Sequence, residues 1–225
     1  MRKVLTTVAL LTTTLWASAQ HKEVTEIAIY RISETQNKNF LKLLTDFRKQ
    51  VSGLNGYKTY ITLQDLQNPN IYIDILPWGD ITTALAASDS VKNGEKHKPF
   101  TSAIDSLVAY GKFYPFKQFI QNKAKTNMTN KITEVVIYQI KADKVNAYEG
   151  IAENTNLFLK APKGFISRKI MQDHNAKSIF MDIVEWETLA DAETAMENTK
   201  QETLLMPFFE ATDKVITFSY YSFFQ

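Results

Sequence analysis

The segment Ile179–Trp186, with the sequence Ile-Phe-Met-Asp-Ile-Val-Glu-Trp, decides how the rest of the chain is interpreted. A second copy, Ile-Tyr-Ile-Asp-Ile-Leu-Pro-Trp, occupies Ile71–Trp78, 108 residues earlier. Each copy is an apolar run of strand length, rich in β-branched and aromatic residues, with one Asp in its middle and a Trp at its end. The chain is therefore predicted to be a duplication in which this strand anchors each half.

The same offset aligns residues on both sides of these strands without a gap. Matched positions are Glu26 with Glu134, Tyr30 with Tyr138, Gly56 with Gly164, Gln64-Asp65 with Gln172-Asp173, Pro99-Phe100 with Pro207-Phe208, and Asp105 with Asp213. A chance register would not persist over a hundred residues, so the two halves are expected to share one fold.

The first 19 residues have the pattern of a secretory signal peptide. Arg2 and Lys3 precede an apolar run, Val4–Trp16, which ends in the small residues Ala17-Ser18-Ala19. This run is shorter than the roughly 20 residues that span a bilayer. We therefore expect export to the periplasm or the outside of the cell, with cleavage after Ala19 and no membrane attachment afterwards.

The remaining chain divides into a first repeat over residues 20–116, a polar linker over 117–130 and a second repeat over 131–225. A net charge of +2, with no basic stripe, gives no reason to expect nucleic acid as a partner. The absence of Cys excludes disulfides, thiolate nucleophiles and sulfur-ligated metals. The three His are not at metal-binding spacing and are expected at the surface, with a reservation for His97 near the end of a helical region. No cofactor or metal site is predicted.

Each repeat reads as β-α-β-β-α-β, the order of a ferredoxin-like unit. In the first repeat, alternation predicts a strand over Val24–Ile32, and apolar residues at helical spacing predict a helix over Phe40–Val51. Two strands follow, Tyr57–Gln64 and Asn70–Trp78, then a helical region over 80–106 and a last strand over Leu107–Tyr114. The second repeat begins likewise with a strand over Ile132–Ile140.

The strand Ile71–Leu76 is nearly all apolar on both faces, whereas one ferredoxin-like unit covers only one face of its sheet with helices. The other repeat is the simplest cover for the second face. The predicted fold is therefore α+β, with two tandem βαββαβ repeats packed sheet to sheet as a pseudo-dimeric α/β barrel. We expect the mature chain to be a monomer.

Three stretches of the second half carry a family resemblance: Lys163–Arg168 (Lys-Gly-Phe-Ile-Ser-Arg), Met181–Ala192, and Pro207-Phe208-Phe209. They resemble the dimeric α/β-barrel superfamily, in particular the antibiotic biosynthesis monooxygenase-like domains. The resemblance implies a barrel fold and an activity like that of cofactor-independent monooxygenases of aromatic compounds.

The haem-degrading branch of that superfamily would require an Asn on the first strand, a Trp, and a His on the second helix. Only the Trp matches here, as Trp78 and Trp186, while Ser88 and Met196 stand at the position of the His. The resemblance therefore does not imply haem degradation.

Period-two alternation places the candidate site residues on one face of two neighbouring strands in each half. The candidates for catalysis are Asp182, Tyr138 and Trp186, and the candidates for ligand binding are Tyr30, Asp74, Trp78, Glu26 and Glu134. A carboxylate within an apolar strand must find a hydrogen-bond partner or stay protonated, and either state could serve in a pocket. The alternatives are that the Asp residues fix the fold through a neighbouring Tyr or a backbone N–H, and that the Trp residues pack in the core. Because the second half keeps the family pattern better, Asp182→Asn is expected to cost more function than Asp74→Asn.

Two functions remain open. The first is an exported enzyme of the monooxygenase type, acting without a bound cofactor on a small aromatic or quinone-like compound. The second is a non-catalytic protein that binds a small apolar or aromatic molecule in the same cavity.

Overall fold

The computed structural model describes residues 22–36, 38–121, 131–199 and 202–224. The predicted signal peptide, 1–19, and most of the predicted linker lie outside the described residues. Within them, no helix is both long enough and apolar enough to cross a membrane.

The first half contains four strands and three α-helices. In chain order these are β1 (Val24–Ile32), α1 (Phe40–Val51), β2 (Ile61–Asp65), β3 (Ile71–Trp78), α2 (Ile81–Asn93), α3 (Lys98–Thr101) and β4 (Ile104–Ile120). Helix α1 turns a buried stripe of Phe40, Leu44, Phe47 and Val51 toward the sheet, at the spacing of an amphipathic helix. Helix α2 begins at a capping box in which Asp80 and Thr83 satisfy each other's backbone N–H groups.

The second half repeats this order. Its elements are β5 (Ile132–Ile140), α4 (Tyr148–Leu159), β6 (Phe165–Asp173), β7 (Ile179–Trp186), α5 (Leu189–Thr199), α6 (Met206–Ala211) and β8 (Thr212–Phe223). Gly56 and Gly164 both adopt a positive φ, 80° and 82°, before β2 and β6. Each is the residue type that this turn requires, because a side chain there would be strained and would also collide with Thr83 or Asp191.

The eight strands close a barrel in the order β1-β3-β2-β8-β5-β7-β6-β4, and all pairs are antiparallel. Two junctions join the halves. The last part of β4 pairs with β6 from Phe113 to Ile120, and the end of β8 pairs with β2 from Tyr221 to Phe223. The halves therefore share backbone hydrogen bonds, and the predicted α+β pseudo-dimeric barrel is confirmed.

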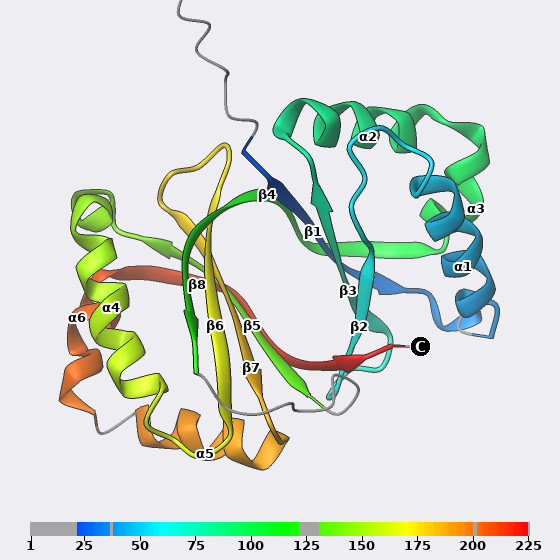
Figure 1. Ribbon diagram of the computed structural model, residues 1–225. Helices are drawn as coiled ribbons and strands as arrows, with labels where there is room; N and C mark the ends of the chain where they lie inside the picture. The colour runs from blue at the N-terminus through cyan, green and yellow to red at the C-terminus, as the bar shows by residue number, and fades with distance from the viewer. Residues whose placement is uncertain (1–21, 37, 122–130, 200–201, 225) are drawn as a thin grey trace, which may run out of the picture.

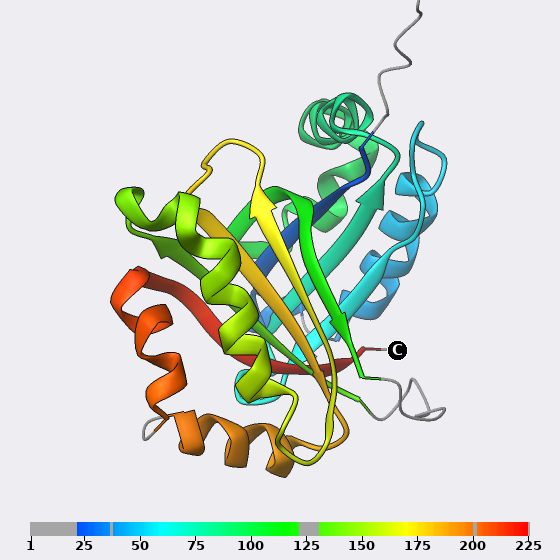
Figure 2. The same ribbon diagram turned by 60° about the vertical axis from the view of Figure 1, so that its left-hand side comes forward.

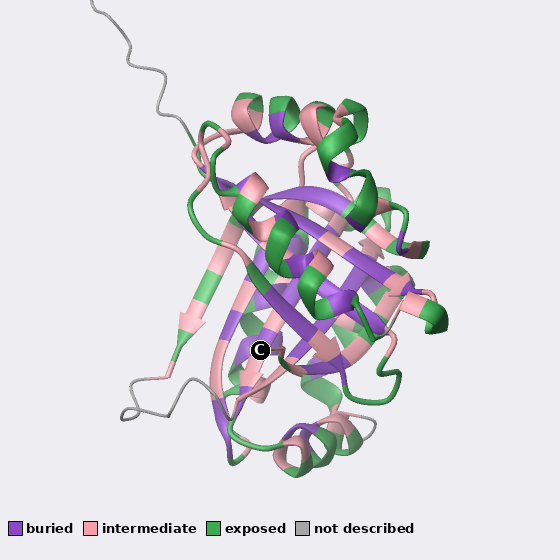
Figure 3. Cartoon of the chain, turned by 90° about the vertical axis from the view of Figure 1, so that its right-hand side faces the viewer, coloured by how far each residue is buried: buried purple, intermediate pink, exposed green. Residues whose placement is uncertain are grey.

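Helices α1, α2 and α3 cover one side of the barrel and α4, α5 and α6 cover the opposite side (Figures 1 and 2). The strands between these two layers carry most of the buried residues (Figure 3). The barrel interior is an apolar cluster drawn from both halves, which includes Ile27, Ile29, Ile73, Val135, Ile137 and Met181. Because burial of one such side chain is worth about 1.5–3 kcal/mol, neither half could expose this surface and stay folded alone.

The boundaries of β2 and β4 differ most from the sequence-based expectation, and β4 also starts at Ile104, inside the region predicted to be helical. Strand β2 begins at Ile61 rather than at Tyr57. Strand β4 continues to Ile120, so Lys117–Ile120 belong to a strand and the predicted linker starts too early. The physical reason is that β6 offers this segment a hydrogen-bonding partner, while Phe116 and Phe119 pack against the core of the second half.

Candidate functional site

Each half holds a cavity between the outer face of its sheet and its helices. All eight predicted site residues line these two cavities. The first-half cavity, of about 480 Å³, is lined by Glu26, Tyr30, Asp74 and Trp78 among others. The second-half cavity, of about 210 Å³, is lined by the equivalent Glu134, Tyr138, Asp182 and Trp186. The prediction that these residues share a face is therefore confirmed, while their roles stay predictions.

A buried Trp and a Glu form the same pair in both halves. The Trp78 indole Nε1–H donates to Glu26 Oε2 at 2.9 Å, and Trp186 Nε1–H donates to Glu134 Oε2 at 2.9 Å. Both indoles are buried, so this bond gives each N–H the partner that it needs away from water. The Trp residues thus pack in the core and also orient a carboxylate toward the cavity.

In the first half, Glu26 belongs to a larger polar cluster. Its Oε1 accepts hydrogen bonds from the Tyr110 hydroxyl and, at 3.0 Å, from the Ser88 hydroxyl. The Lys112 ammonium lies 3.5 Å from the same oxygen and donates to the Tyr110 hydroxyl at 2.6 Å. Lys112 is buried, so its ammonium group lies beside the Glu26 carboxyl group away from water.

Asp74 has no such cation in hydrogen-bond contact. Its carboxylate accepts from the Tyr60 hydroxyl at 2.6 Å and from the Thr62 hydroxyl at 2.5 Å. Burial raises the pKa of Asp74 to about 6, although the hydrogen bonds from Thr62 and Tyr60 oppose the rise. A carboxyl group with this pKa exchanges a proton near neutral pH, as a general base must.

The Tyr30 hydroxyl is fully buried and lies near the Asp74 carboxylate, but it makes no hydrogen bond of acceptable geometry among the described residues. Burial, and secondarily the nearby charge of Asp74, raise the pKa of Tyr30 well above its usual value. The phenol therefore stays protonated and is able to donate a hydrogen bond to a molecule in the cavity. An unpaired buried hydroxyl costs free energy, which a bound polar atom would recover.

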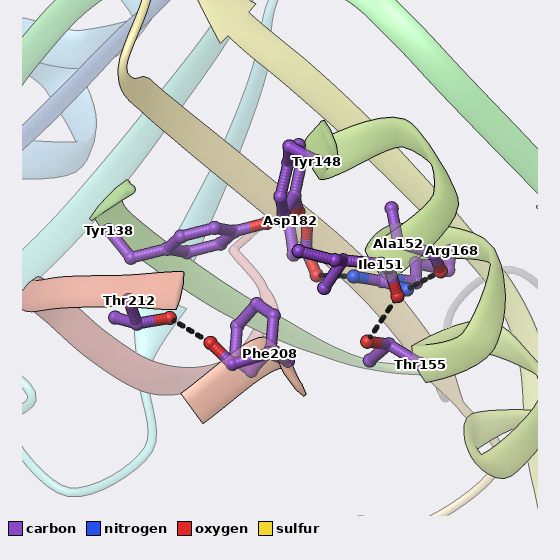
Figure 4. A network of polar contacts seen from close by, with 9 residues as sticks. All are labelled: Tyr138, Tyr148, Ile151, Ala152, Thr155, Arg168, Asp182, Phe208 and Thr212. Atoms are coloured by element: carbon purple, nitrogen blue, oxygen red, sulfur yellow. Dashed lines mark hydrogen bonds and ion pairs between the residues drawn. The ribbon is translucent and has the colours of Figure 1, made fainter. Parts of the chain in front are cut away.

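In the second half, unlike the first, the buried Asp has a cation in contact with it (Figure 4). Arg168, which is fully buried, donates through Nε and Nη2 to Asp182 Oδ2 at 2.8 and 2.6 Å, and through Nη1 to the Ala152 carbonyl at 3.0 Å. The Tyr138 hydroxyl donates to Asp182 Oδ1 at 2.8 Å and also contacts the Tyr148 hydroxyl. Arg168 on Oδ2 and the Tyr138 hydroxyl on Oδ1 together occupy both oxygens of Asp182, which favours a structural role for it.

Glu134 lacks the cation that its equivalent Glu26 has. Tyr220 stands where the first half has Lys112, and the Tyr220 hydroxyl has no partner among the described residues. Burial raises the pKa of Glu134 to about 7, despite the hydrogen bond from Trp186. In each half, one of the two carboxyl groups lies beside a buried cation and the other does not. The Glu has the cation in the first half, and the Asp has it in the second half.

These differences bear on the expectation that Asp182 matters more than Asp74. The first-half cavity is larger, and its Asp74 carboxyl is free of a counterion contact. Met196 replaces Ser88 and Arg168 replaces Tyr60 in the second half, so its cavity is narrower and its Asp is neutralised. The geometry favours Asp74 as the more reactive carboxyl, and our proposal below places the chemistry there.

The sequence analysis did not identify the other polar residues of these networks as site residues: Tyr60, Thr62, Ser88, Tyr110, Lys112, Tyr148, Arg168 and Tyr220. Lys112 was missed because its position directly opposite Glu26 depends on the register between β1 and β4, which alternation within one strand does not give. The same holds for Thr62, which is opposite Asp74 on β2 and β3.

His97 is buried rather than at the surface, and its ring packs edge-on against Phe47 at a centroid distance of 5.7 Å. It is not among the residues that line the first-half cavity, so it does not supply the His that haem degradation would require. Among the described residues, no group of three His, Asp or Glu side chains is arranged to hold a metal ion.

No protein-family model matches the chain, and neither does any curated protein sequence. Solved structures do match. An anthrone oxidase-like protein has a TM-score of 0.72 at 9% identity, covering 92% of this chain and 93% of its own. A mutant chlorite dismutase from Candidatus Nitrospira defluvii has a TM-score of 0.64 at 8% identity, over 90% and 92%. A ferredoxin-fold protein related to antibiotic biosynthesis monooxygenases, from Listeria monocytogenes, has a TM-score of 0.50 at 10% identity, over 91% and 96%.

At these identities the likeness shows the fold alone. It agrees with the closed barrel and with the βαββαβ order of each half. The chain therefore has the fold of the antibiotic biosynthesis monooxygenase-like ferredoxin-fold proteins, with two such units closing one barrel within a single chain.

Proposed function

We propose that this chain is an exported, monooxygenase-like oxidase that uses its first-half cavity to bind and oxidise a small aromatic compound. The observation that carries the proposal is that one cavity of about 480 Å³ holds a carboxyl group with a pKa of about 6 and, beside it, a buried phenol that makes no hydrogen bond of good geometry within the described part of the chain. A cavity of this size and apolar lining suits a molecule of two or three fused rings.

The substrate that fits this pair has an acidic C–H or O–H next to a carbonyl or phenolic oxygen, as in anthrone-like and quinol-like compounds. Ionised Asp74 takes the proton, and the Tyr30 hydroxyl donates a hydrogen bond to the substrate oxygen, on which negative charge develops. Trp78 and the aromatic side chains Phe47 and Phe100 supply flat apolar walls for the rings.

The reaction balances without an external reductant. For an anthrone-like substrate, Asp74 takes one proton of a CH₂ group, the resulting carbanion is oxidised by O₂, one oxygen atom becomes the new carbonyl oxygen, and the other leaves as water with the two hydrogens of that CH₂ group. For a quinol, two protons and two electrons pass from the two O–H groups to O₂, which gives a quinone and hydrogen peroxide. The names of the anthrone oxidase-like and monooxygenase-related neighbours support this class of reaction, and the substrate itself is our inference.

Oxygen uptake with anthrone and with a substituted quinol tests the proposal. We expect one O₂ consumed per anthrone, and a rate that rises with pH through about 6 as Asp74 ionises. Asp74→Asn should abolish turnover, and Tyr30→Phe should raise KM and lower kcat. Asp46→Asn is the matched control, because Asp46 is an exposed carboxylate whose partner is Lys42.

A second candidate function is the binding of a small molecule without catalysis. It is favoured by the second half, which keeps such a cavity even though its Asp182 has a counterion. If aromatic compounds bind saturably but no oxygen is consumed, the chain is a binding protein. If they neither bind nor react, the first-half cavity is not a site for this class of molecule.

A further inference from the structure

A third cavity, of about 350 Å³, lies inside the barrel, on the opposite side of the sheet from the two cavities described above. Its lining comes from inward-facing residues near one end of the strands. Several lining residues are equivalent positions of the two halves: Thr25 with Thr133, Ile75 with Ile183, and Leu63 with Met171. The cavity therefore lies between the halves, near the pseudo-twofold axis, and exists only because they form one barrel.

The wall of this barrel cavity is mainly aliphatic and aromatic, with Ile75, Ile183, Leu63 and Phe223 among its residues. Its volume lies within the roughly 300–1,000 Å³ typical of small-molecule sites. The cavity opens at the barrel end, where Ile61 and Phe223 are exposed, and narrows between the strands, so an apolar chain suits it better than a large ring system.

Three charged residues line the cavity: Lys131, Lys169 and Glu185. Glu185 is already neutralised, because its Oε2 accepts from Lys131 Nζ at 3.2 Å and from the Ser167 hydroxyl at 2.9 Å. Lys169 forms no ion pair within the part of the chain that the structure describes. The cavity thus carries one uncompensated positive charge next to an apolar interior.

Thr25 supplies an independent observation. It lines the same cavity, it is 1% exposed, and its hydroxyl has no hydrogen-bond partner among the described residues. In native proteins a buried hydroxyl is nearly always paired, with protein or with a bound molecule. The barrel cavity therefore offers an apolar body site, a free cation and an unused hydroxyl.

We propose that the barrel cavity binds an aliphatic monocarboxylate, such as a medium-chain fatty acid, with its chain in the barrel and its carboxylate held by Lys169. A monoanion matches the net charge of the three ionic groups. A ligand here would contact both halves and so stabilise the barrel as a unit, independently of any reaction in the first-half cavity.

Titration of the purified protein with octanoate, followed by calorimetry and by NMR of methyl-labelled methionines, tests this proposal. Met171 lines the barrel cavity and Met196 lines the second-half cavity, so the chain carries its own reporters. We expect saturable binding that shifts the Met171 methyl resonance and leaves that of Met196 unchanged.

Lys169→Met should weaken octanoate at least about tenfold while leaving the binding of 1-octanol unchanged, since only the former uses the cation. Lys163→Met is the matched control, because the Lys163 side chain is 89% exposed. Thr25→Val, which removes the hydroxyl and keeps the shape, should raise the melting temperature of the free protein and lower octanoate affinity.

Three outcomes would overturn the proposal. They are the absence of saturable octanoate binding, binding of equal strength in Lys169→Met and the parent protein, and a shift at Met196 without one at Met171. Neither variant alters the first-half cavity, so these outcomes are distinct from a failure of the proposed oxidation.

Discussion

Replacing Asp74 and Asp182 by Asn should change stability in opposite directions, although the two residues are equivalent in the repeat. For Asp74, the folded pKa of about 6 lies above its ordinary value of 3.8. This difference corresponds to about 3 kcal/mol. Because the folded pKa is the higher one, the unfolded chain releases its proton first as pH rises. Stability therefore falls between about pH 4 and pH 6, and the whole penalty is present at pH 8.

Asn at position 74 cannot ionise, so it removes that penalty. It weakens the hydrogen bonds from Tyr60 and Thr62, which is worth about 1 kcal/mol. The net expectation at pH 8 is a gain of about 2 kcal/mol, and near pH 4, where little of the penalty is present, the weakened hydrogen bonds leave a loss of at most about 1 kcal/mol. Asn at position 182 instead leaves the fully buried guanidinium of Arg168 without its counterion, and a loss of about 3–5 kcal/mol is expected.

Urea unfolding followed by the fluorescence of Trp78 and Trp186 at pH 8 and pH 4 measures both effects. Oxygen uptake on the same samples shows whether the more stable Asp74→Asn variant has lost its activity. A destabilised Asp74→Asn variant at pH 8, or a stability of Asp182→Asn equal to that of the parent, would refute the electrostatic reasoning.

Three other predictions follow from the same contacts. Arg168→Met should cost about 3–5 kcal/mol at pH 8, and Arg168→Met with Asp182→Leu should recover most of it, as urea unfolding would show. Glu134→Gln should stabilise the protein by about 3 kcal/mol at pH 8 and not at pH 4, because burial raises the folded pKa of Glu134 from 4.5 to about 7 and the charged form is the unfavourable one. Light scattering of the mature protein should give the mass of one chain, and an obligate dimer would contradict the idea that β4–β6 and β2–β8 already close the barrel internally.

The fold was predictable because two independent signals agreed. The duplication fixed the element order of both halves, and the strand Ile71–Leu76, apolar on both faces, required a second cover for the sheet. The extension of β4 to Ile120 was not predictable from that segment, because it depends on a partner strand in the other half. Lys117–Ile120 are mixed in polarity, and only pairing with β6 makes them a strand.

The site was predictable as far as single strands allow. Alternation within β1 and β3 identified Glu26, Tyr30, Asp74 and Trp78 as one face, and the structure confirms that they share one cavity. Their hydrogen-bond donors sit on other strands, so finding them requires the register between strands. Position 168 illustrates the limit, because nothing in a lone Arg within an expected strand reveals that it is fully buried.

The reversed pairing of carboxyl groups in the two halves is a consequence of placing both units in one chain. In a homodimer a single sequence serves both sites, so a cation introduced beside one Asp appears beside both. Here Arg168 places a cation beside Asp182, whereas Tyr60 at the equivalent position brings no charge, and burial raises the pKa of Asp74 to about 6. The free-energy penalty of about 3 kcal/mol for an ionised Asp74 is likewise confined to the first half. The second half, with its buried ion pair and smaller cavity, can supply rigidity to the shared barrel, and the first half can keep the groups without a counterion that binding or chemistry needs.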